Sequence, residues 1–552
     1  MSIEKTISRI SQKSDSYEKK DSNGVQITAV HSTSSLESDE VAKNPFIDPK
    51  VEEYYRNLYT ESKYECYPAF DPEFNWTEEE EKKVIRKIDI RVALAACIMF
   101  VGLQVDRGNL AQAVTDNMLE DLGMTTNDYN TGNTIFYVTF LLAEIPSQLI
   151  SKALGPDMFI PIQICLWSIV ALCQAALSGK VSFYITRALI GILEGGFIAD
   201  LVLWLSYFFK SKELPVRLSW FWTTLSLVQI GTSLLAFGIL RMRGVGGLAG
   251  WRWLFLIEGI FTLLIGISSF FLMVPSALQT KNWLYRNGWF TEREEKIVVN
   301  RVLRDDPTKG SMHNRQGLTP RMIGKSLLDY HLWPIFAIGV VAYIGQNTFT
   351  AYFGLLNRQL GFSVFTTNLL TIPQAVLHII LLLAITWFSE RINERSWVCV
   401  LAPLYATPLI AIIRWWPGAG IKVWPTYVLN TLYLGQPYIH AICVSWVSRN
   451  SNSVRTRSVS SALYNMFVQL GSVIGMNIYR TDDVPLYHRG NMQLFVITAA
   501  LIPLLILTKY YYVYQNKRRD GIWNSMTEDQ KDYYRKNTTD EGNNRLDFRF
   551  SH

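Results

Sequence analysis

Long apolar runs fill the middle of this 552-residue sequence, and they constrain its fold more than any other feature. A helix needs about 20 mostly apolar residues to cross a bilayer. Twelve runs approach this length, at residues 92–114, 132–151, 158–177, 182–208, 217–240, 251–274, 332–356, 366–389, 397–416, 421–447, 457–479 and 492–514. Because backbone amides in lipid must be hydrogen-bonded within their own segment, the sequence predicts an all-α membrane protein with twelve transmembrane helices.

The longest connection between runs separates the first six from the last six, and it contains a charged helical pattern, TEREEKIVVNRVLRDD. Two groups of six around a long loop are typical of transporters built from repeats. We therefore expect six-helix halves at residues 92–274 and 332–514, a central loop at 275–331, and polar tails at 1–91 and 515–552.

Basic residues predict the orientation, because loops rich in Lys and Arg stay on the cytoplasmic side. Residues 115–131, after the first run, contain four acidic residues and no Lys or Arg. The connections after runs four, six, eight and ten are basic, with Lys210, Lys212, Arg217, Arg391, Arg395, Arg449 and Arg455 among their residues. These connections and both tails are therefore predicted to be cytoplasmic, although Arg241 and Arg243 fall on the other side.

The tail at residues 1–91 is rich in Ser, Lys, Glu and Asp, which predicts a mostly disordered chain. Its end, DPEFNWTEEEEKKVIRKID, predicts a short juxtamembrane helix with Thr77 as N-cap. The N-terminus lacks the apolar core of a signal peptide, so the first run would direct insertion. The sequons at Asn75 and Asn537 lie on predicted cytoplasmic segments, and we expect both to be unglycosylated.

No pattern in the sequence is typical of an enzyme, a metal site or a nucleic-acid-binding protein. The net charge of +6 is spread along the chain without a long basic block. The six cysteines have no metal-ligand spacing, and five of them fall inside apolar runs, which predicts small core side chains. We find no nucleophile–base set and no phosphate-binding loop, so no enzymatic activity and no cofactor are expected.

Two adjacent ionisable residues, Asp106 and Arg107, lie inside the first run. Asp106 is roughly 24 Å along the helix, in the middle to outer half of the bilayer. It shares a helix face with Asn109, whereas Arg107 points about 100° away. Intramembrane charges are functional by default, and Arg107 can bind a carboxylate or similar anion through two hydrogen bonds. The alternative is a structural ion pair with a second helix.

The fourth run places Arg187, Gly191 and Glu194 on one helix face. Glu194 lies roughly 20 Å along this span, near mid-membrane. A buried carboxyl group can exchange a proton near neutral pH; the alternative is a permanently neutral or Arg-paired structural acid. Gly191, Gly195 and Gly196 would allow another helix to approach closely.

Two further acids lie in the first half. Asp200 could be a second proton site or face a cytoplasmic vestibule, and both readings stay open. Glu144, beside the helix-kinking Pro146, is nearer the cytoplasmic end and is assigned a structural or gating role. Because ionisable residues concentrate in the first half, proton coupling is predicted there.

Polar, mostly uncharged side chains interrupt the apolar runs of the second half. They include Tyr343, Gln346, Asn347, His378, Gln436, His440, Tyr464, Asn465 and Gln469. A substrate cavity needs hydrogen-bonding groups among apolar walls. For each residue singly, the alternative is a hydrogen bond between helices. Together with the midplane cation Arg107, they favour a small organic anion as substrate.

Several segments resemble a known family. VDRGNLAQA is similar to the DRxNxxxA segment in span one of the anion:cation symporters, a branch of the major facilitator superfamily. FYVTFLLAEIPSQLISKALGPDMFIP, RALIGILEGGF and GWRWLFLIEG resemble spans two and three, four and six. LGFSVFTTNLLTIP, FSERINERS, WVSRNSNSVRTRSVSSALYNM and NIYRTDDVPLYHRGN look like the fungal allantoate-permease group, and the resemblance covers about residues 70–520.

The resemblance implies a proton-coupled symporter that works by alternating access. It implies proton coupling for Asp106 and Glu194, and Arg187 matches the superfamily's span-four arginine. The substrate-binding assignment is Arg107, Asn109, Tyr137, Tyr343, Gln346, Asn347, Gln436, Tyr464 and Asn465. The usual Asp-Arg gating pair is missing after span two. The gating assignment is Glu144 together with Glu390, Arg391 and Arg395, which follow span eight.

Members of this fungal group take up allantoate, ureidosuccinate, nicotinate, pantothenate, biotin, cysteine or sulfonates, and no rule selects one of them here. The leading hypothesis is import of allantoate, a vitamin carboxylate, or a sulfur-containing amino acid or sulfonate. The alternatives are a non-transporting nutrient receptor on the same fold and an uncoupled facilitator. We expect a monomer in the plasma membrane, with the endoplasmic reticulum or vacuole left open.

Overall fold

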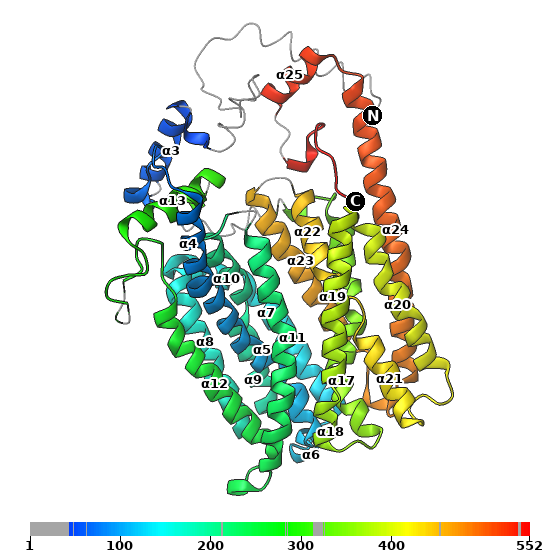
Figure 1. Ribbon diagram of the computed structural model, residues 1–552. Helices are drawn as coiled ribbons and strands as arrows, with labels where there is room; N and C mark the ends of the chain where they lie inside the picture. Colours follow the sequence, from blue (N-terminus) through cyan, green and yellow to red (C-terminus); the bar gives the residue numbers. More distant parts are fainter. Residues whose placement is uncertain are drawn as a thin grey trace.

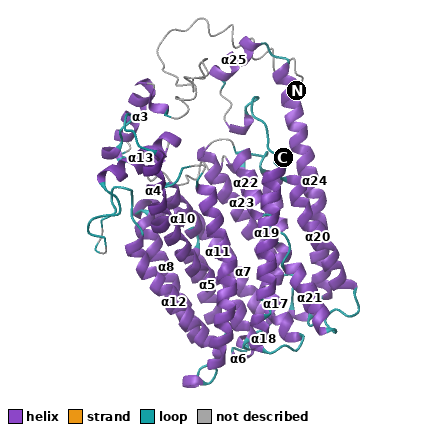
Figure 2. Cartoon of the chain, in the orientation of Figure 1, coloured by secondary structure: helices purple, strands orange, loops and turns teal. Residues whose placement is uncertain are grey.

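The computed structural model describes residues 44–47, 49–61, 63–210, 213–281, 283, 285–307, 309–312, 324, 326–451, 454–538 and 542–552. Every regular element within these ranges is a helix, which confirms the all-α prediction (Figure 2). The helices run side by side, with the earlier and later parts of the chain forming two neighbouring groups (Figure 1).

The first group contains the helices that match the first six apolar runs. They are α5 (Leu94–Thr115), α7 (Thr126–Leu154), α8 (Pro156–Cys173), α9 (Lys180–Glu194) with α10 (Phe197–Ser206), α11 (Leu214–Ile239) and α12 (Gly250–Leu272). The second group matches the last six runs. It comprises α16 (Trp333–Ala342) with α17 (Ile344–Gln359), α19 (Ile372–Ile392), α20 (Ser396–Trp415), α21 (Val423–Leu434) with α22 (His440–Asn450), α23 (Val454–Gly475) and α24 (His488–Asn524).

Nine helical stretches among the described residues are long and apolar enough to cross a membrane. The three other predicted spans correspond to α16 with α17, to α21 with α22, and to α23. The first two of these are broken into shorter helices. The multi-span architecture is therefore clear, and the count of twelve stays a prediction.

Each terminal tail contains a helix, α3 (Pro49–Glu61) in the N-terminal tail and α25 (Glu528–Asn537) in the C-terminal tail. Both helices extend beyond the same end of the helix bundle (Figure 1). We call this end the tail end and the opposite one the far end. The basic loops predict that the tail end is cytoplasmic. The helix order places the start of α7 at the far end and its last turn at the tail end.

The segment before the first span is folded from residue 44 onward. Phe46, Tyr59 and Phe70 are buried and pack edge to face, with ring centroids 5.0 and 5.2 Å from Phe70. The prediction of a mostly disordered 1–91 tail now concerns residues 1–43, which lie outside the described residues. Polar composition hid this unit, because a few aromatic side chains bury enough surface to hold it.

The juxtamembrane helix appears as α4 (Glu78–Ile88), and Thr77 caps it as predicted, forming a capping box with Glu80. The central loop contributes a partner helix, α13 (Glu292–Asp305). Lys87 binds Glu294 and Arg293 binds Glu80, each at 2.7 Å. The N-terminal tail and the central loop therefore form one charged, helical cap at the tail end.

Hydrogen bonds join the two groups at the far end. The Asn130 side chain donates to the carbonyl oxygen of Tyr479 at 2.6 Å and accepts from the Tyr352 hydroxyl. The Tyr129 hydroxyl donates to the carbonyl oxygen of Ala351 at 3.2 Å. These residues are buried, so the bonds are shielded from water and strengthened by the low local dielectric. The far end is therefore closed between the groups.

Arg241 and Arg243, the two basic residues on the side predicted to be non-cytoplasmic, have local partners. Arg243 binds Asp116 at 3.2 Å and Asp121 at 3.0 Å, and both acids belong to the loop after α5. Arg241 lies over the rings of Phe237 and Phe365, at 4.2 and 5.0 Å. The acids offset the charge of Arg243, which explains how a basic residue fits at the far end.

Glycines let α7 and α9 pack backbone to backbone, as their spacing predicted. A Cβ built at Gly191 would lie 2.5 Å from the carbonyl oxygen of Phe136 and would also overlap Thr139. We expect Gly191→Ala to destabilise the protein by about 1–3 kcal/mol, because α7 must move away. The measurement is the thermal unfolding midpoint in detergent. The control is Gly231→Ala, whose Cβ would meet no described atom within 4 Å; equal midpoints would contradict the packing argument.

Candidate functional site

Span four breaks directly after Glu194. Gly195 ends α9 in an extended conformation, and Gly196 has a φ of +82°, in the left-handed region that favours glycine. The Gln163 side chain donates to the carbonyl oxygen of Gly195 at 2.8 Å, and Gln148 donates to that of Gly196 at 3.3 Å. The break therefore holds Glu194 at a helix end inside the first group, with its backbone satisfied by neighbouring helices.

Arg107 reaches this carboxylate from α5. Its Nε donates to Glu194 Oε2 at 2.7 Å, while Glu194 is fully buried and the Arg107 side chain is 23% exposed. Arg107 Nη2 and Glu194 Oε1 are also buried, and neither has a hydrogen-bond partner among the described residues. The pair is thus joined by a single hydrogen bond, with donor and acceptor capacity unused on both sides.

Aromatic rings and a second arginine surround this pair. Arg107 lies 5.0 Å from the ring centroid of Phe140, and Arg187 lies 4.3 Å from that of Phe136. Arg187 Nη2 donates to Asn133 Oδ1 at 3.2 Å. Tyr137 lies within electrostatic range of both arginines. The sequence-predicted residues Arg107, Arg187, Glu194 and Tyr137 therefore come together in one buried, net-cationic cluster of the first group.

Asp106 faces a different neighbour. Its Oδ2 accepts from Trp167 Nε1 of α8 at 3.1 Å, and the residue is 1% exposed. Asn109 is fully buried, and its amide atoms have no partner within the ranges that the structure describes. The sequence predicts that Asp106 faces the helix of Glu194 and that Arg107 faces an anion. In the structure it is Arg107 that contacts Glu194, so the ion pair of the alternative reading is present.

Glu258 of α12 is a buried acid that the sequence interpretation missed. It is 2% exposed, and in the described part of the chain neither carboxylate oxygen has a hydrogen-bond partner. It lies within electrostatic range of Asp106. The signal was available, since Glu258 is the penultimate residue of the segment GWRWLFLIEG that carried part of the family resemblance. Besides carrying the family resemblance, the segment places an acid inside the membrane, and an intramembrane charge is functional by default.

Glu144 and Asp200 lie between Glu194 and the tail end. Both are buried, at 7% and 1% exposure. Glu144 borders a narrow cavity between α7 and α23, where Val459, Leu463 and Met466 provide apolar walls. Asp200 interacts with Ser151 of α7 and lies within electrostatic range of Glu144. Asp200 is therefore packed against α7 rather than exposed to a vestibule.

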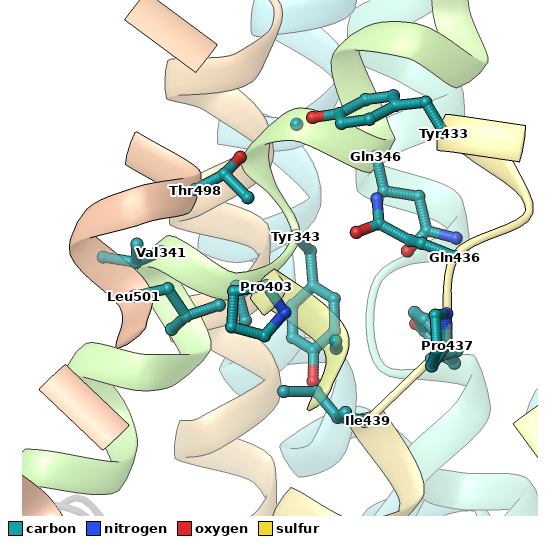
Figure 3. A pocket seen from close by; sticks show the side chains of 14 residues that line it. Val341, Tyr343, Gln346, Pro403, Tyr433, Gln436, Pro437, Ile439, Thr498 and Leu501 are labelled. Atoms are coloured by element: carbon teal, nitrogen blue, oxygen red, sulfur yellow. The ribbon is translucent and has the colours of Figure 1, made fainter. Parts of the chain in front are cut away.

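The second group contains a narrow pocket that collects three of the predicted substrate residues. Tyr343, Gln346 and Gln436 line it, together with Tyr433 and Thr498 (Figure 3). Span seven breaks at Tyr343 and span ten breaks at Gly435–Ile439, so both breaks open onto this pocket. Interrupted helices expose backbone polar groups inside a membrane protein, which is useful where they border a cavity.

The other predicted residues of this group have partners on neighbouring helices. The Tyr343 and Tyr464 hydroxyls are 2.9 Å apart, and Asn347 Nδ2 donates to Ser472 Oγ at 2.7 Å. Gln346 Nε2 and His378 Nδ1 are 3.3 Å apart. Asn465, beside Tyr464 on α23, is partly exposed. These contacts match the alternative of interhelical hydrogen bonds for Asn347 and Tyr464, and leave Gln346 and Gln436 on the pocket wall.

His440 connects the pocket region to the first group. Its ring centroid lies 5.5 Å from Tyr343 and 5.6 Å from Tyr464, and 5.7 Å from Trp222 of α11. Gln229 of α11 likewise donates to Gln374 of α19 at 3.2 Å. Aromatic and amide contacts therefore cross between the two groups beside the pocket. Trp222 was not identified from the sequence, because an isolated tryptophan in an apolar run carries no distinguishing pattern.

The predicted gating residues only partly assemble. Glu390, at the tail end of α19, lies 3.5 Å from Arg395 and 3.6 Å from Arg449 of α22. Arg391 is exposed, and Glu144 lies elsewhere, between α7 and α23. In the sequence, Arg449 indicates only the orientation of its loop. Its pairing with Glu390 needed the tertiary structure, since the two residues are 59 positions apart (449 − 390).

Comparison with known proteins identifies the family. Residues 93–476 match the family model described as Major Facilitator Superfamily. The protein belongs to the major facilitator superfamily. An uncharacterized transporter of Saccharomyces cerevisiae is 44% identical over 529 residues, covering 96% of this chain and 97% of that protein. The major facilitator-type transporter hxnP of Emericella nidulans is 26% identical, covering 82% and 88%.

Solved members of the superfamily share the fold. The xylose transporter XylE from E. coli, in a partially occluded inward-open conformation, superposes with a TM-score of 0.55. The two sequences are 14% identical, and the match covers 77% of this chain and 97% of that chain. The protein is therefore a multi-pass membrane transporter of the major facilitator type rather than an enzyme. Its place within the allantoate-permease group stays a prediction.

Proposed function

We propose that this transporter is a proton-coupled symporter that imports a small organic anion by alternating access. The observation that carries the proposal is the buried ion pair between Arg107 and Glu194. A carboxylate or sulfonate offers Arg107 the same kind of acceptor oxygen that Glu194 now supplies. Allantoate, a vitamin carboxylate, and a sulfur-containing amino acid or sulfonate are the candidate classes.

Competition for Arg107 links anion binding to proton binding. If an anion replaces Glu194 as the partner of Arg107, Glu194 is left as an unpaired carboxylate at a fully buried position. An unpaired buried charge costs several kcal/mol, and taking up a proton removes that cost. By linkage, a protonated Glu194 also leaves Arg107 available for the anion. Proton and anion therefore bind together or not at all.

Unused capacity in the pair supports this exchange. Arg107 Nη2 and Glu194 Oε1 both lack partners among the described residues, so the guanidinium can turn toward an anion without breaking other bonds. Arg187 shares the Phe136 ring with Arg107 and adds positive charge to the site. Asp106 lies within electrostatic range of Glu194, and its hydrogen bond to Trp167 directs it toward α8.

The second group supplies the remaining contacts of the proposed site. Gln346 and Gln436 offer amide donors and acceptors from the pocket wall, and Tyr343 lies beside them. The closed far end fits a state in which access would come from the tail end. If the tail end is cytoplasmic, opening of that end releases imported substrate. Rocking of the two groups about the site would complete the cycle.

The test combines a binding screen with a transport assay. The purified protein is screened by thermal shift against the candidate anions, and any stabilising anion is then offered to proteoliposomes with an alkaline interior. We expect accumulation above the external concentration, together with proton entry. Movement of the anion only down its own gradient would favour the uncoupled facilitator. Binding without any movement would favour the receptor.

A further inference from the structure

The C-terminal segment returns to the tail end of the second group and binds between two helices (Figure 1). Asn516 of α24 donates to the Phe550 carbonyl oxygen at 2.9 Å and accepts from the Phe550 amide at 2.8 Å. Asn450 of α22 makes the same two bonds to Ser551, at 3.2 and 2.8 Å. In an extended chain, successive residues direct their backbone groups to opposite sides. Asn516 on α24 therefore binds the backbone of Phe550, and Asn450 on α22 binds the backbone of Ser551.

The side chain of Phe550 adds an anchor to these backbone bonds. It is 3% exposed and packs on Tyr512 and His331, with ring centroids 5.1 and 4.9 Å away. The Arg519 guanidinium lies 4.5 Å from its centroid on another side. Trp446 of α22 donates its indole N–H to the Ser551 carbonyl oxygen at 2.7 Å. The peptide thus fills an aromatic pocket and ties α22 to α24.

The helix that the peptide holds is a short, hinged element. α22 has 11 residues and is separated from α21 by the non-helical Gly435–Ile439. Its first residue, His440, lies beside the pocket and against Trp222 of the first group. Its last residue, Asn450, is held by the C-terminal peptide. One rigid helix of about 15 Å therefore links the peptide to the candidate substrate region.

We propose that Phe548–Ser551 is an autoinhibitory latch, whose release lets α22 tilt about Gly435–Ile439 and opens the tail end of the transporter. The groove between α22 and α24 is the receptor surface for this peptide. The latch holds α22 in place through Trp446 and Asn450, while Glu390 holds Arg449 on its other side. Removing residues 542–552 also removes the hydrogen bond from Asn543 to the Asn450 carbonyl oxygen. The end of α22 is then restrained by the long Glu390–Arg449 contact and by Tyr512 against Asn450, besides its packing.

The latch is tested by hydrogen exchange on the full-length protein in nanodiscs and on a chain that ends at residue 541. We expect amide exchange in residues 440–451 to rise on the order of tenfold or more in the shortened chain, because opening of α22 becomes local. Exchange in α20 should stay unchanged, which reports an intact fold. Unchanged exchange in residues 440–451 would overturn the proposal.

A peptide added in trans provides a matched control for folding defects. A synthetic peptide of residues 542–552 should restore slow exchange to the shortened chain, and the same peptide with Phe550→Ala should not. A cysteine introduced as Met466→Cys, which borders the cavity between α7 and α23, should be alkylated faster without the latch. Equal effects of both peptides, or equal alkylation, would refute the latch. None of these measurements needs a substrate or a proton gradient, so they are independent of the proposed function.

Acid should weaken the latch through His331. Burial, together with Arg519 and Arg518, lowers the pKa of His331 to about 4. Its Nδ1 lies 2.8 Å from the Tyr511 hydroxyl and its Nε2 accepts from Arg519 at 3.4 Å, an arrangement that requires the neutral ring. Among the described residues, further titratable neighbours are Asp329 and Tyr330 in its own loop and Tyr512 of α24, whose hydroxyl donates to the His331 carbonyl oxygen at 2.7 Å. A lowered histidine pKa means that the closed latch disfavours the proton, so its stability is complete above about pH 6.5 and falls below it.

The measurement is the affinity of a labelled 542–552 peptide for the shortened chain. Between pH 7.5 and 5.5 we expect binding to weaken by up to about tenfold, the limit for one proton over the unit below pH 6.5. His331→Gln should remove this dependence while leaving binding at pH 7.5 measurable. Binding that is equally pH-dependent in the variant would assign the effect to another group.

Discussion

Replacing Arg107 with alanine is expected to abolish anion binding to the transporter. Truncating one partner of a buried, hydrogen-bonded charge pair costs about 2–5 kcal/mol, which corresponds to a loss of affinity of about 30-fold or more. Arg107 is the arginine that contacts Glu194, and it has a buried Nη2 group without a partner in the described chain. The measurement is the dissociation constant of the anion found in the screen, by calorimetry or thermal shift.

Two controls separate binding from folding in this experiment. Arg107→Lys keeps the charge but loses the planar, two-pronged donor, so it should retain partial affinity. Arg241→Ala removes an arginine at the far end, where its described contacts are two phenylalanine rings, and should leave affinity unchanged. Undiminished affinity in Arg107→Ala, in a protein that melts normally, would exclude Arg107 from the substrate site.

Replacing Glu194 with glutamine should uncouple anion transport from the proton gradient. A pH gradient of one unit supports up to about tenfold accumulation per coupled proton, and the variant should accumulate none. Exchange of anion across the membrane should persist, because the site no longer needs a proton to free Arg107. The same reasoning predicts that anion affinity in the variant is as high as, or higher than, that of the parent and does not vary with pH.

The buried acid Glu258 is the matched control for this prediction. It is as buried as Glu194, but it faces Asp106 rather than an arginine. Glu258→Gln should therefore keep pH-dependent anion affinity. If Glu194→Gln still accumulates the anion uphill, the proposed coupling fails. If both variants lose accumulation equally, coupling belongs to the whole set of buried acids and not to the Arg107 pair.

Sequence reasoning located the important charges but not their partners. Depth along a helix follows from a rise of 1.5 Å per residue, so Asp106, Arg107 and Glu194 could be placed inside the membrane from numbering alone. Helix periodicity also showed that Asp106 and Arg107 point apart. Which neighbour each one meets depends on the rotation and order of the surrounding helices. In the structure Arg107 forms an ion pair with Glu194, and Asp106 accepts a hydrogen bond from Trp167.

In the tails, a polar average composition predicts disorder, although a few aromatic side chains are enough to make a segment fold. Phe46, Tyr59 and Phe70 form an aromatic cluster inside a segment whose average is polar. Phe550 does the same in the last residues of the chain. An average over many polar positions hides these anchors. Their binding surfaces are built from α13, α22 and α24, which lie far away in the sequence, so only the folded chain reveals them.

The amino-acid sequence by itself determined that the chain is a helical membrane protein with two apolar halves and charges at mid-membrane depth. These properties follow from hydrophobicity and helix periodicity, which act along one segment at a time. The tertiary structure alone decided the break after Glu194, the ion pair to Arg107, the burial of Glu258 and the C-terminal peptide held by Asn450 and Asn516. Each of these depends on contacts between distant segments, whose geometry is set by packing of the whole bundle.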